Sequence, residues 1–425
     1  MGKILYLPAK IAIVNKKINW VPLFSSNFLG VLNDNLLKNL ICFISIYWFP
    51  TEYHSTIISL ATGFMVLPYI LFSPFSGFLS KTFYKQKIVF YAKFAEIPIM
   101  TMAFTGFWIE NIYVVMTAMF FMGFQSAMYS PAKFGLITDI GGEESISFGT
   151  GFIEALTFLG VLIGTFLAGI VSDVKEHRLI VIAIAFAIVS FSGFISSTFI
   201  KATESKPLKK GKLPLNSINF ILRNHKWSKL NVPGLNNAVF GLSAFWLIGS
   251  LIQLNMLVHC PQTLKMTNTQ TGIVMALVAI SIGFGTWLSG VISRKNVELG
   301  LIPIGGVGLA FFDTVIFIFN PNGTIFTILI MLAAFSAGIM KTPINAWMQK
   351  NVKGRKIGDA IAYNNLINFV FILISAGIFG IVENIFGTRV VFAVIALFAW
   401  YLVYFLSNNL DGVRESFKRV MRLKD

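Results

Sequence analysis

Residues 201–234, KATESKPLKKGKLPLNSINFILRNHKWSKLNVPG, form the longest polar stretch of this 425-residue chain, and they carry eight Lys and Arg residues. Apolar runs dominate on both sides of this insert, and they are close to the 20 or so residues that a helix needs to cross the hydrocarbon core of a bilayer. An unpaired backbone group in lipid is costly, so such runs must be helices. The insert therefore divides a membrane protein into two parts.

We predict an all-α membrane protein with twelve transmembrane helices, six on each side of the insert. The predicted limits are 22–48, 57–80, 88–108, 112–130, 148–171, 179–200, 235–258, 270–292, 300–319, 324–347, 359–382 and 390–407. Three regions follow: an N-terminal six-helix bundle (1–200), a cytoplasmic basic linker (201–234) and a C-terminal six-helix bundle with a basic cytoplasmic tail (235–425).

The composition excludes a soluble protein. Hydrophobic residues make up 56% of the chain and charged residues only 12%, against about 25% charged in soluble domains. The net charge of +16 lies in short runs between apolar segments rather than on one face, so no nucleic-acid partner is predicted. Cys42 and Cys260 fall in or beside spans, and we expect neither a disulfide framework, nor a metal site, nor a cofactor.

The distribution of Lys and Arg gives the orientation, because basic residues in short loops stay in the cytoplasm. With the N-terminus inside, 27 of the 34 lie on the cytoplasmic side, and only Lys175, Arg178, Lys265 and Arg389 lie outside. The remaining three, Lys38, Lys93 and Lys341, fall within spans. This bias predicts a multi-pass protein of the cytoplasmic (inner) membrane with both termini in the cytoplasm.

A faint internal repeat relates the two parts. Ser126-Ala127 recurs as Ser336-Ala337, and Gly169-Ile170-Val171 recurs as Gly380-Ile381-Val382. Both offsets are about half the chain length, and they pair the fourth span with the tenth and the fifth with the eleventh. Two related halves are typical of transporters built from repeats.

Ionisable residues within spans mark functional sites, because they are expensive in lipid. In the first span, Asn27, Asp34 and Lys38 share one face of the helix, which should point into the bundle. They are candidate substrate-binding residues. The alternative is an Asp34–Lys38 pair, one helical turn apart, that merely neutralises itself.

Glu154 in the fifth span is the second candidate. It lies near Gly160, Gly164 and Gly169, whose spacing predicts a close helix contact. Function and a buried structural role are equally open for Glu154. Lys133 and Lys341 lie at the inner ends of the fourth and tenth spans. Either could line a cavity, but snorkelling to the interface would be a sufficient explanation.

The same structural explanation is favoured for Lys93 with Glu96, one turn apart in the third span, while Asp313 stands alone in the ninth. Gln253, with Asn255, lies in the seventh span, and Asn364, Asn365 and Asn368 lie in the eleventh. These amides could hydrogen-bond between helices or hold a polar headgroup.

No soluble catalytic motif is present. The chain contains no His-x4-Asp pair, no Gly-x4-Gly-Lys-Ser/Thr loop and no HExxH site. We therefore expect no enzyme activity, although a membrane-bound acyltransferase and a transport-dead scaffold for one remain alternatives.

The chain resembles the major facilitator superfamily and, within it, the lysophospholipid transporter family. The resemblance rests on short motifs in both halves: Phe28-Leu29-Gly30, Asn33-Asp34-Asn35-Leu36-Leu37-Lys38-Asn39, Ser130-Pro131-Ala132-Lys133-Phe134-Gly135, Gly151-Phe152-Ile153-Glu154, Pro343-Ile344-Asn345-Ala346 with Gln349, and Ile361-Ala362 with Asn364-Asn365. It is nearest to the transporter domain that some bacteria fuse to an acylglycerophosphoethanolamine acyltransferase.

The sequence departs from these families at three positions. Lys81 stands where the superfamily's loop motif carries an acidic residue, which puts the usual charge relay in doubt. Gln253 and Asn368 stand where the stand-alone lysophospholipid transporters carry an Arg and a Glu. Joint loss of both charges leaves neither one unpaired.

The resemblance implies the major facilitator fold, two pseudo-symmetric six-helix bundles, and movement of lysophosphatidylethanolamine-like lipids from the outer to the inner leaflet for reacylation. It implies a substrate site formed by Asn27, Asp34, Lys38, Lys133 and Glu154 from one half and by Gln253, Asn364 and Asn368 from the other. The expected partners are the lysophospholipid, membrane lipids and a separate acyltransferase or acyl-carrier-protein ligase, and the expected state is a monomer. The alternative function is proton-coupled transport of another small solute through Asp34 or Glu154.

Overall fold

The computed structural model describes residues 19–44, 48–50, 54–174, 176–208, 216–293 and 296–421. These residues form fourteen α-helices and two short 3-10 helices, without a β-strand in the described ranges. The prediction of an all-α protein is confirmed.

Six long helices precede the linker. They are α1 (Val21–Ile44), α2 (His54–Thr82), α3 (Lys85–Trp108), α4 (Ile112–Gly141), α5 (Ile146–Asp173) and α6 (Arg178–Thr198). Six more follow it. They are α8 (Leu235–Gln262), α9 (Asn268–Ser293), α10 (Leu301–Phe319), α11 (Gly323–Asn351), α12 (Ile357–Phe386) and α13 (Thr388–Asn409). Four short helices complete the described chain: η3 (Glu143–Ser145), α7 (Ser217–Asn231), η4 (Gly354–Lys356) and α14 (Val413–Val420).

Eleven of the twelve long helices are long and apolar enough to span a membrane, as judged over the described residues. The twelfth, α1, falls short because it carries Asn33, Asp34, Asn35, Lys38 and Asn39 within two turns. It nevertheless packs along α5 and α6 inside its half. Its polar side chains are tolerated because protein, rather than lipid, surrounds them.

Several helices are longer than predicted. We expected the fourth and tenth spans to end at 130 and 347, but α4 continues to Gly141 and α11 to Asn351. Hydropathy marks only the part of a helix in hydrocarbon, and the backbone hydrogen bonds continue into water. Helices α7 and α14 were not predicted, because each is short and neither contains an apolar run.

The two halves repeat one packing scheme. In the first, α1 packs on α5 and α6, α2 on α4, and α3 on α4 and α6. In the second, α8 packs on α12 and α13, α9 on α11, and α10 on α11 and α13. The halves meet through the equivalent pairs α5–α9 and α2–α12. The two bundles are therefore pseudo-symmetric.

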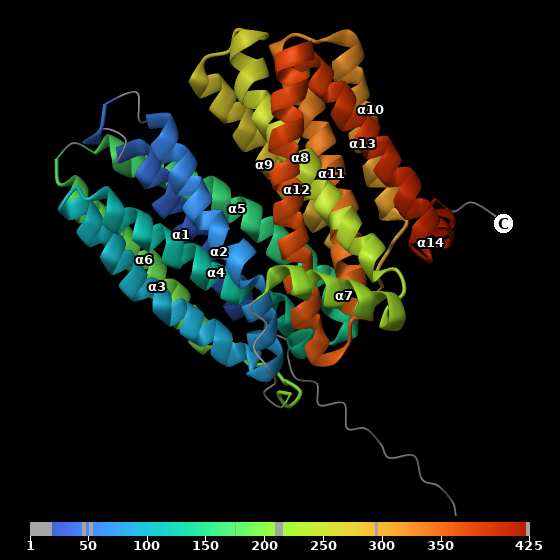
Figure 1. Ribbon diagram of the computed structural model, residues 1–425, viewed down its shortest axis with the longest axis horizontal. Coiled ribbons are helices and arrows are strands. Elements are labelled where there is room, and N and C mark those ends of the chain that lie inside the picture. The colour runs from blue at the N-terminus through green and yellow to red at the C-terminus, as the bar shows by residue number, and fades with distance from the viewer. Residues whose placement is uncertain are drawn as a thin grey trace, which may run out of the picture.

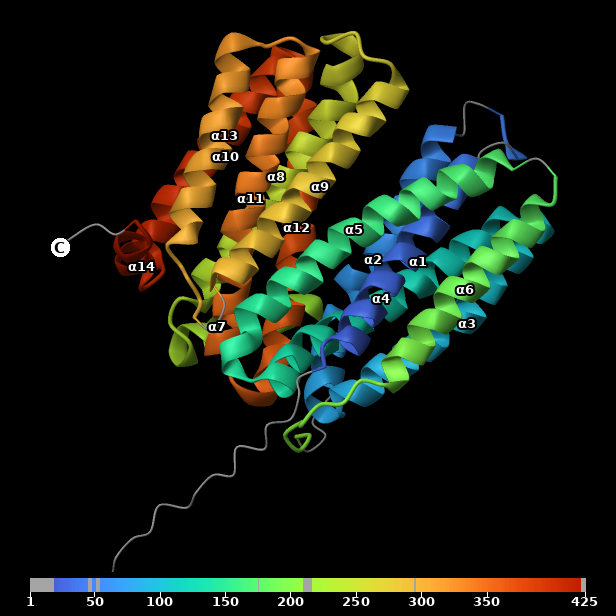
Figure 2. The ribbon, with the colours of Figure 1, turned by 180° about the vertical axis from the view of Figure 1, so that it is seen from behind.

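The two bundles touch at one end and diverge toward the other (Figures 1 and 2). We call the end that holds α7 and the linker segment 201–208 the linker end, and the opposite end the splayed end. Helices α2 and α9 begin at the splayed end, and α5 and α12 finish there.

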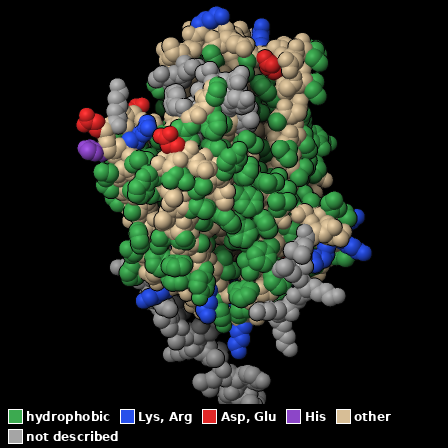
Figure 3. All heavy atoms as spheres, turned by 60° about the vertical axis from the view of Figure 1, so that its left-hand side comes forward, with side chains coloured by type: hydrophobic (Ala, Val, Ile, Leu, Met, Phe, Trp, Pro, Cys, Tyr) green, Lys and Arg blue, Asp and Glu red, His purple; other side chains and the backbone are tan. Residues whose placement is uncertain are grey.

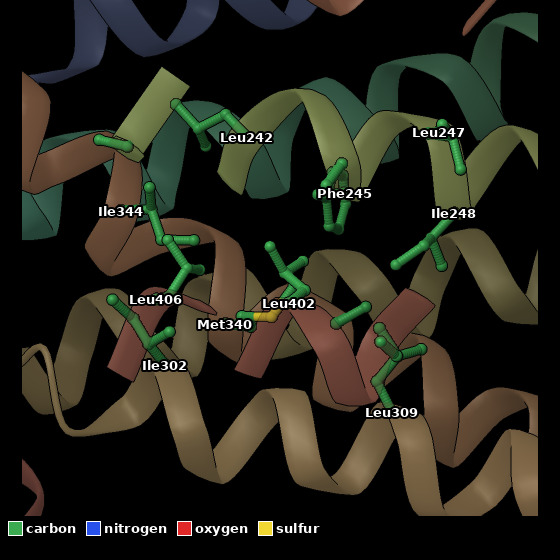
Figure 4. Packing of buried hydrophobic residues seen from close by; sticks show 14 of the residues in the cluster. Leu242, Phe245, Leu247, Ile248, Ile302, Leu309, Met340, Ile344, Leu402 and Leu406 are labelled. Atoms are coloured by element: carbon green, nitrogen blue, oxygen red, sulfur yellow. The ribbon is translucent and has the colours of Figure 1, made fainter. Parts of the chain in front are cut away.

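Each half has its own apolar core. In the second half, Leu242, Ile302, Met340 and Leu406 come from four different helices and pack together, as Figure 4 shows. The first half contains two smaller clusters. On the face in Figure 3, hydrophobic side chains cover the middle and charged ones lie near the two ends, as expected where lipid surrounds the waist of the molecule.

Candidate functional site

A buried arginine joins the two halves at the linker end. Arg355 follows α11, yet its Nη1 donates to the carbonyl oxygens of Phe83 (2.6 Å) and Ser80 (3.3 Å) at the end of α2. Its Nη2 donates to the carbonyl oxygen of Ser205 in the linker. The side chain of Glu204 pairs with Arg355 Nη1 at 3.3 Å. The guanidinium of one half thus fills a socket built by the other half and the linker.

Glu204 is fixed at the same time by the start of α3. Its two carboxylate oxygens accept from the backbone N–H groups of Lys85 (2.6 Å) and Gln86 (2.9 Å). These donors are free at a helix N-terminus, where a carboxylate is favourable. The Glu204 carboxylate in the Arg355 socket is therefore also held by backbone contacts that do not involve Arg355.

A second ion pair crosses the halves nearby. Lys81 Nζ at the end of α2 lies 2.6 Å from Asp359 Oδ2 in the first turn of α12. Gly77 fits tightly on the same seam, because a Cβ added to it would lie 3.0 Å from the Cβ of Ala362. Lys81 stands where an acidic residue was expected, yet a charge contact between the halves is present, with the cation on α2 and the anion on α12.

Glu154 and Lys341 form a third link, deeper between the halves. Lys341 Nζ on α11 lies 2.5 Å from Glu154 Oε2 on α5, and both side chains are buried. The amide of Asn345 donates to Glu154 Oε1 at 3.0 Å, one turn toward the linker end. One turn further, Gln349 donates to Thr150 Oγ1 at 2.9 Å.

Aromatic rings surround the Lys341 ammonium. Its Nζ lies 4.7 Å from the ring centre of Trp246, 5.1 Å from that of Phe245 and 5.5 Å from that of Phe158. Ring faces attract cations at these distances. Snorkelling, our interpretation of Lys341 from the sequence, is therefore wrong, because opposite charge and aromatic rings hold its ammonium inside the protein.

The α1 face predicted to point inward does so. Asp34 Oδ2 accepts from Ser126 Oγ of α4 at 2.8 Å, and Asn27 Oδ1 accepts from Lys133 Nζ at 2.8 Å. Asn27 also donates to the Ile153 carbonyl oxygen, next to Glu154. Lys133 thus points into the first half instead of snorkelling, and it lies within electrostatic range of Asp34, Glu154 and Lys341.

The self-neutralising pair within α1 is not formed. Lys38 Nζ donates to Asn35 Oδ1 at 3.3 Å, and the ion pairs found among the described residues do not include Asp34 with Lys38. Asp34 Oδ1 is buried and has no hydrogen-bond partner in the described chain. The Asp34 carboxyl therefore keeps one free acceptor.

Lys93 and Glu96 on α3 form a further buried ion pair, next to α1. Lys93 Nζ lies 2.5 Å from Glu96 Oε1, and both side chains are almost fully buried. Gln125 donates to the same Glu96 oxygen at 2.9 Å. Snorkelling is wrong for Lys93 too, because its ammonium packs directly on Gly30 of α1.

The three candidates from the second half do not form one cluster. Asn368 Oδ1 accepts from Ser243 Oγ at 2.8 Å, within that half. Asn364 is buried, and its Oδ1 has no hydrogen-bond partner among the residues described. Gln253 is exposed on α8, seven residues from Trp246 and on the same helical face. Gln253 therefore lies about 10 Å from Trp246 along the axis of α8, toward the splayed end, and so beyond the aromatic rings that surround the Lys341 ammonium.

The sequence did not predict Lys341 and Asn345 as site residues. It also did not predict that Asn365 Nδ2 on α12 donates to Ser130 Oγ on α4 at 3.0 Å, which is a contact between the halves. One signal was available for Lys341. It lies in the linker-side third of its span, as Glu154 does, and the charges are opposite. Among the described residues no three His, Cys, Asp or Glu side chains are grouped to hold a metal ion.

Both halves of the chain are similar to known proteins. Residues 23–376 match the family model of the Major Facilitator Superfamily. The chain is 24% identical to the Lysophospholipid transporter LplT of Escherichia fergusonii over 395 residues, which covers 88% of this chain and 94% of that protein.

Two solved structures have the same fold. The human organic anion transporter MFSD10 (TETRAN) aligns with a TM-score of 0.71 at 14% identity, over 91% of this chain and 99% of that one. FucP, a Major Facilitator Superfamily transporter in the outward conformation, aligns with a TM-score of 0.70 at 14% identity, over 90% and 98%.

Proposed function

This chain belongs to the Major Facilitator Superfamily, and we propose that it is a secondary transporter of lysophospholipids. It moves lysophosphatidylethanolamine-like lipids from the outer to the inner leaflet of the cytoplasmic membrane, where they are reacylated. The sequence similarity to Lysophospholipid transporter LplT over most of both chains supports this substrate class. Transport, rather than catalysis, is the activity of this protein.

The linker end faces the cytoplasm in this proposal. Lys and Arg side chains are concentrated in the linker and the segments near it, and basic residues are retained on that side of a membrane. Both termini then lie in the cytoplasm, with 1–200 and 235–425 as the two bundles and 201–234 as the connection between them. The structure, closed at the linker end, corresponds to the outward-facing state of alternating access.

The observation that carries the proposal is the buried polar cluster between the halves. Glu154, Lys341 and Asn345 come from α5 and α11, and they lie where the diverging bundles meet. A phosphate-containing headgroup needs polar partners of this kind. An apolar pathway would offer none.

In this proposal the predicted site residues line the path of the headgroup at different levels and do not form a single group with this cluster. Asn27, Asp34, Lys38 and Lys133 approach it from α1 and α4, and Gln253 extends it along α8 toward the splayed end. Asn364 and Asn368 on α12 complete the second half of the site. The bundles rock about this level, which exposes the headgroup first to one leaflet and then to the other.

The acyl chain stays in lipid during this movement. Each buried CH2 contributes about 0.8 kcal/mol, so that drawing a whole chain into water would be prohibitive. The path must therefore open sideways to the bilayer, along the seams α2–α12 and α5–α9 where the halves meet. Only the headgroup then crosses through protein.

We place the protein in the inner membrane as a monomer that supplies its product to a separate acyltransferase or acyl-carrier-protein ligase. No bound cofactor is part of the mechanism. Consumption of the lipid by reacylation would maintain the gradient that drives transport.

Uptake by reconstituted vesicles tests the proposal. Purified protein in vesicles should accelerate the transfer of labelled lysophosphatidylethanolamine between leaflets at least tenfold over protein-free vesicles. Folded protein that gives no acceleration would end the proposal. Proton-driven uptake of an unrelated solute, lost in Asp34→Asn or Glu154→Gln, would favour the alternative function.

A further inference from the structure

The Glu154–Lys341 pair joins the two halves in the linker-side third of the spans. Its partners are 187 residues apart in the chain, and each belongs to a helix that would move with its own half. The relative exposure of Glu154 is 6% and that of Lys341 is 3%. Any opening of the linker end must separate this pair.

Separation leaves two buried charges without partners, which is strongly unfavourable. Lys133 is also within electrostatic range, but its Nζ already donates to Asn27 Oδ1 at 2.8 Å, so it does not take the place of Lys341. The Asn345 amide already donates to Glu154, and the rings of Phe158, Phe245 and Trp246 attract the ammonium without neutralising it. The pair therefore holds the empty protein closed until charged groups arrive from elsewhere.

We propose that a zwitterionic headgroup binds by exchanging partners with this pair: its phosphate binds Lys341 and its ammonium binds Glu154. The inference rests on the proposed function and names the class of lysophospholipid that the site selects. Such a headgroup brings one charge of each sign, so both buried residues remain paired when the halves separate. Binding of the lipid therefore allows the halves to separate at the linker end.

The surroundings of the pair suit both charges of the ligand. Phe158 lies four residues after Glu154 on α5, one turn along the same helical face. A headgroup ammonium on Glu154 would therefore lie beside an aromatic ring, as the Lys341 ammonium does now. Lys133 lies within electrostatic range of both partners and adds positive charge for a phosphate.

Selectivity follows from the charge balance. A lysophospholipid with phosphate but no amine, such as lysophosphatidylglycerol, would occupy Lys341 and leave the Glu154 carboxylate unpaired beside a second anion. Lysophosphatidylethanolamine avoids this. The intact protein should therefore prefer the zwitterion.

The test compares uptake of lysophosphatidylethanolamine and lysophosphatidylglycerol of equal chain length by the full-length protein in vesicles. We expect the wild type to prefer the ethanolamine lipid at least tenfold. Glu154→Gln should reduce uptake of the ethanolamine lipid about tenfold and bring the preference within twofold. The matched control Lys350→Gln, which removes the other lysine of α11, should leave uptake and preference unchanged.

A double variant in which the two charges are exchanged controls for misfolding of the single variant. Glu154→Lys combined with Lys341→Glu restores the charge balance and should keep at least a fivefold preference. The inference is overturned if the wild type takes up both lipids equally, or if folded Glu154→Gln keeps the wild-type preference. The absence of uptake of either lipid by the wild type would instead overturn the proposed function.

Discussion

The two ends of helices α5 and α9 differ sharply although the same helices form both. Toward the linker end, a Cβ on Gly151 of α5 would lie 2.8 Å from the Cα of Gly290 on α9, so the helices touch backbone to backbone. Toward the splayed end, a Cβ on Gly169 or on Gly272 would meet nothing within 4 Å. One end is a close-packed seam, whereas the glycines at the other end face open space.

This difference shows where the halves are held and how. The linker end combines glycine contacts with three ion pairs between the halves, formed by Lys81, Glu154 and Lys353 with partners across the seam, and with the Arg355 socket. Polar contacts of this kind can be broken and remade without loss of a core. The buried residues of the two main apolar clusters come from one half each, or from the adjoining α7, so these clusters would stay intact if the halves moved.

Filling the close-packed seam should have the largest effect. Gly151→Val would force α5 and α9 apart at the linker end, and we expect uptake of lysophosphatidylethanolamine to fall at least fiftyfold. The matched variant Gly169→Val, on the same helix in open space, should stay within twofold of the wild type. Equal losses in the two variants would show that the ends do not differ in the way described.

Removing the Asp34 carboxylate on α1 should have the next largest effect. Asp34→Asn keeps the size of the side chain and a partner for Ser126, but it removes a negative charge beside Lys133. We expect uptake to fall about tenfold. Asn39→Ala, which loses a hydrogen bond to Thr165 nearer the splayed end, serves as the control and should change uptake less than threefold. Unchanged transport by Asp34→Asn would remove this residue from the mechanism.

Weakening the contacts of Arg355 should shift the equilibrium from a closed toward an open linker end. Hydrogen bonds to charged groups contribute about 1.5–3 kcal/mol, so Arg355→Gln should favour opening of the linker end by about tenfold. The readout is labelling of a cysteine placed at the buried Thr150, with Cys42 and Cys260 replaced.

Lys353→Gln is the control for this change, because the Lys353–Glu143 ion pair also crosses the halves but is largely exposed. An exposed pair contributes little, and labelling should change less than twofold. Slower labelling in Arg355→Gln than in the control would contradict the role of the socket.

The smallest effect concerns a carboxyl inside one half, away from both ends. Asp313 on α10 is fully buried, and its two oxygens have no hydrogen-bond partner among the described residues. Asp313→Leu should stabilise the fold by about 1–3 kcal/mol, since it removes an unsatisfied polar group from apolar surroundings. Thermal unfolding of purified protein measures this, with Asp34→Leu as a contrast that should not be stabilised. A lower melting temperature for Asp313→Leu would indicate a partner for this carboxyl.

The fold could be predicted from the sequence because apolar length and basic loops are local signals. The predicted close helix contact at Gly160 and Gly164 is confirmed, since a Cβ there would lie 3.1 Å from the Phe28 oxygen and 2.5 Å from the Leu32 oxygen of α1. It is wrong at Gly169, which has open space around it. Small residues indicate that a helix can approach closely, but not whether a neighbour extends that far.

The site was harder to predict for a related reason. Periodicity placed Asn27 and Asp34 on the inner face of α1, but it could not show that Glu154 and Lys341 pair across the halves. That contact depends on how two bundles are rotated against each other. Arg355 could not be predicted as a site residue because three of its partners are backbone carbonyl oxygens, which any sequence provides, and the fourth, Glu204, lies 151 positions away in the chain.

Two distances measured in one protein test the central claim most directly. Spin labels at Gly169 and Gly272 report on the splayed end, and labels at the exposed Glu143 and Lys353 report on the linker end. Addition of lysophosphatidylethanolamine should shorten the first distance and lengthen the second. Distances that stay unchanged in protein that still transports the lipid would contradict a mechanism in which the substrate releases the linker end.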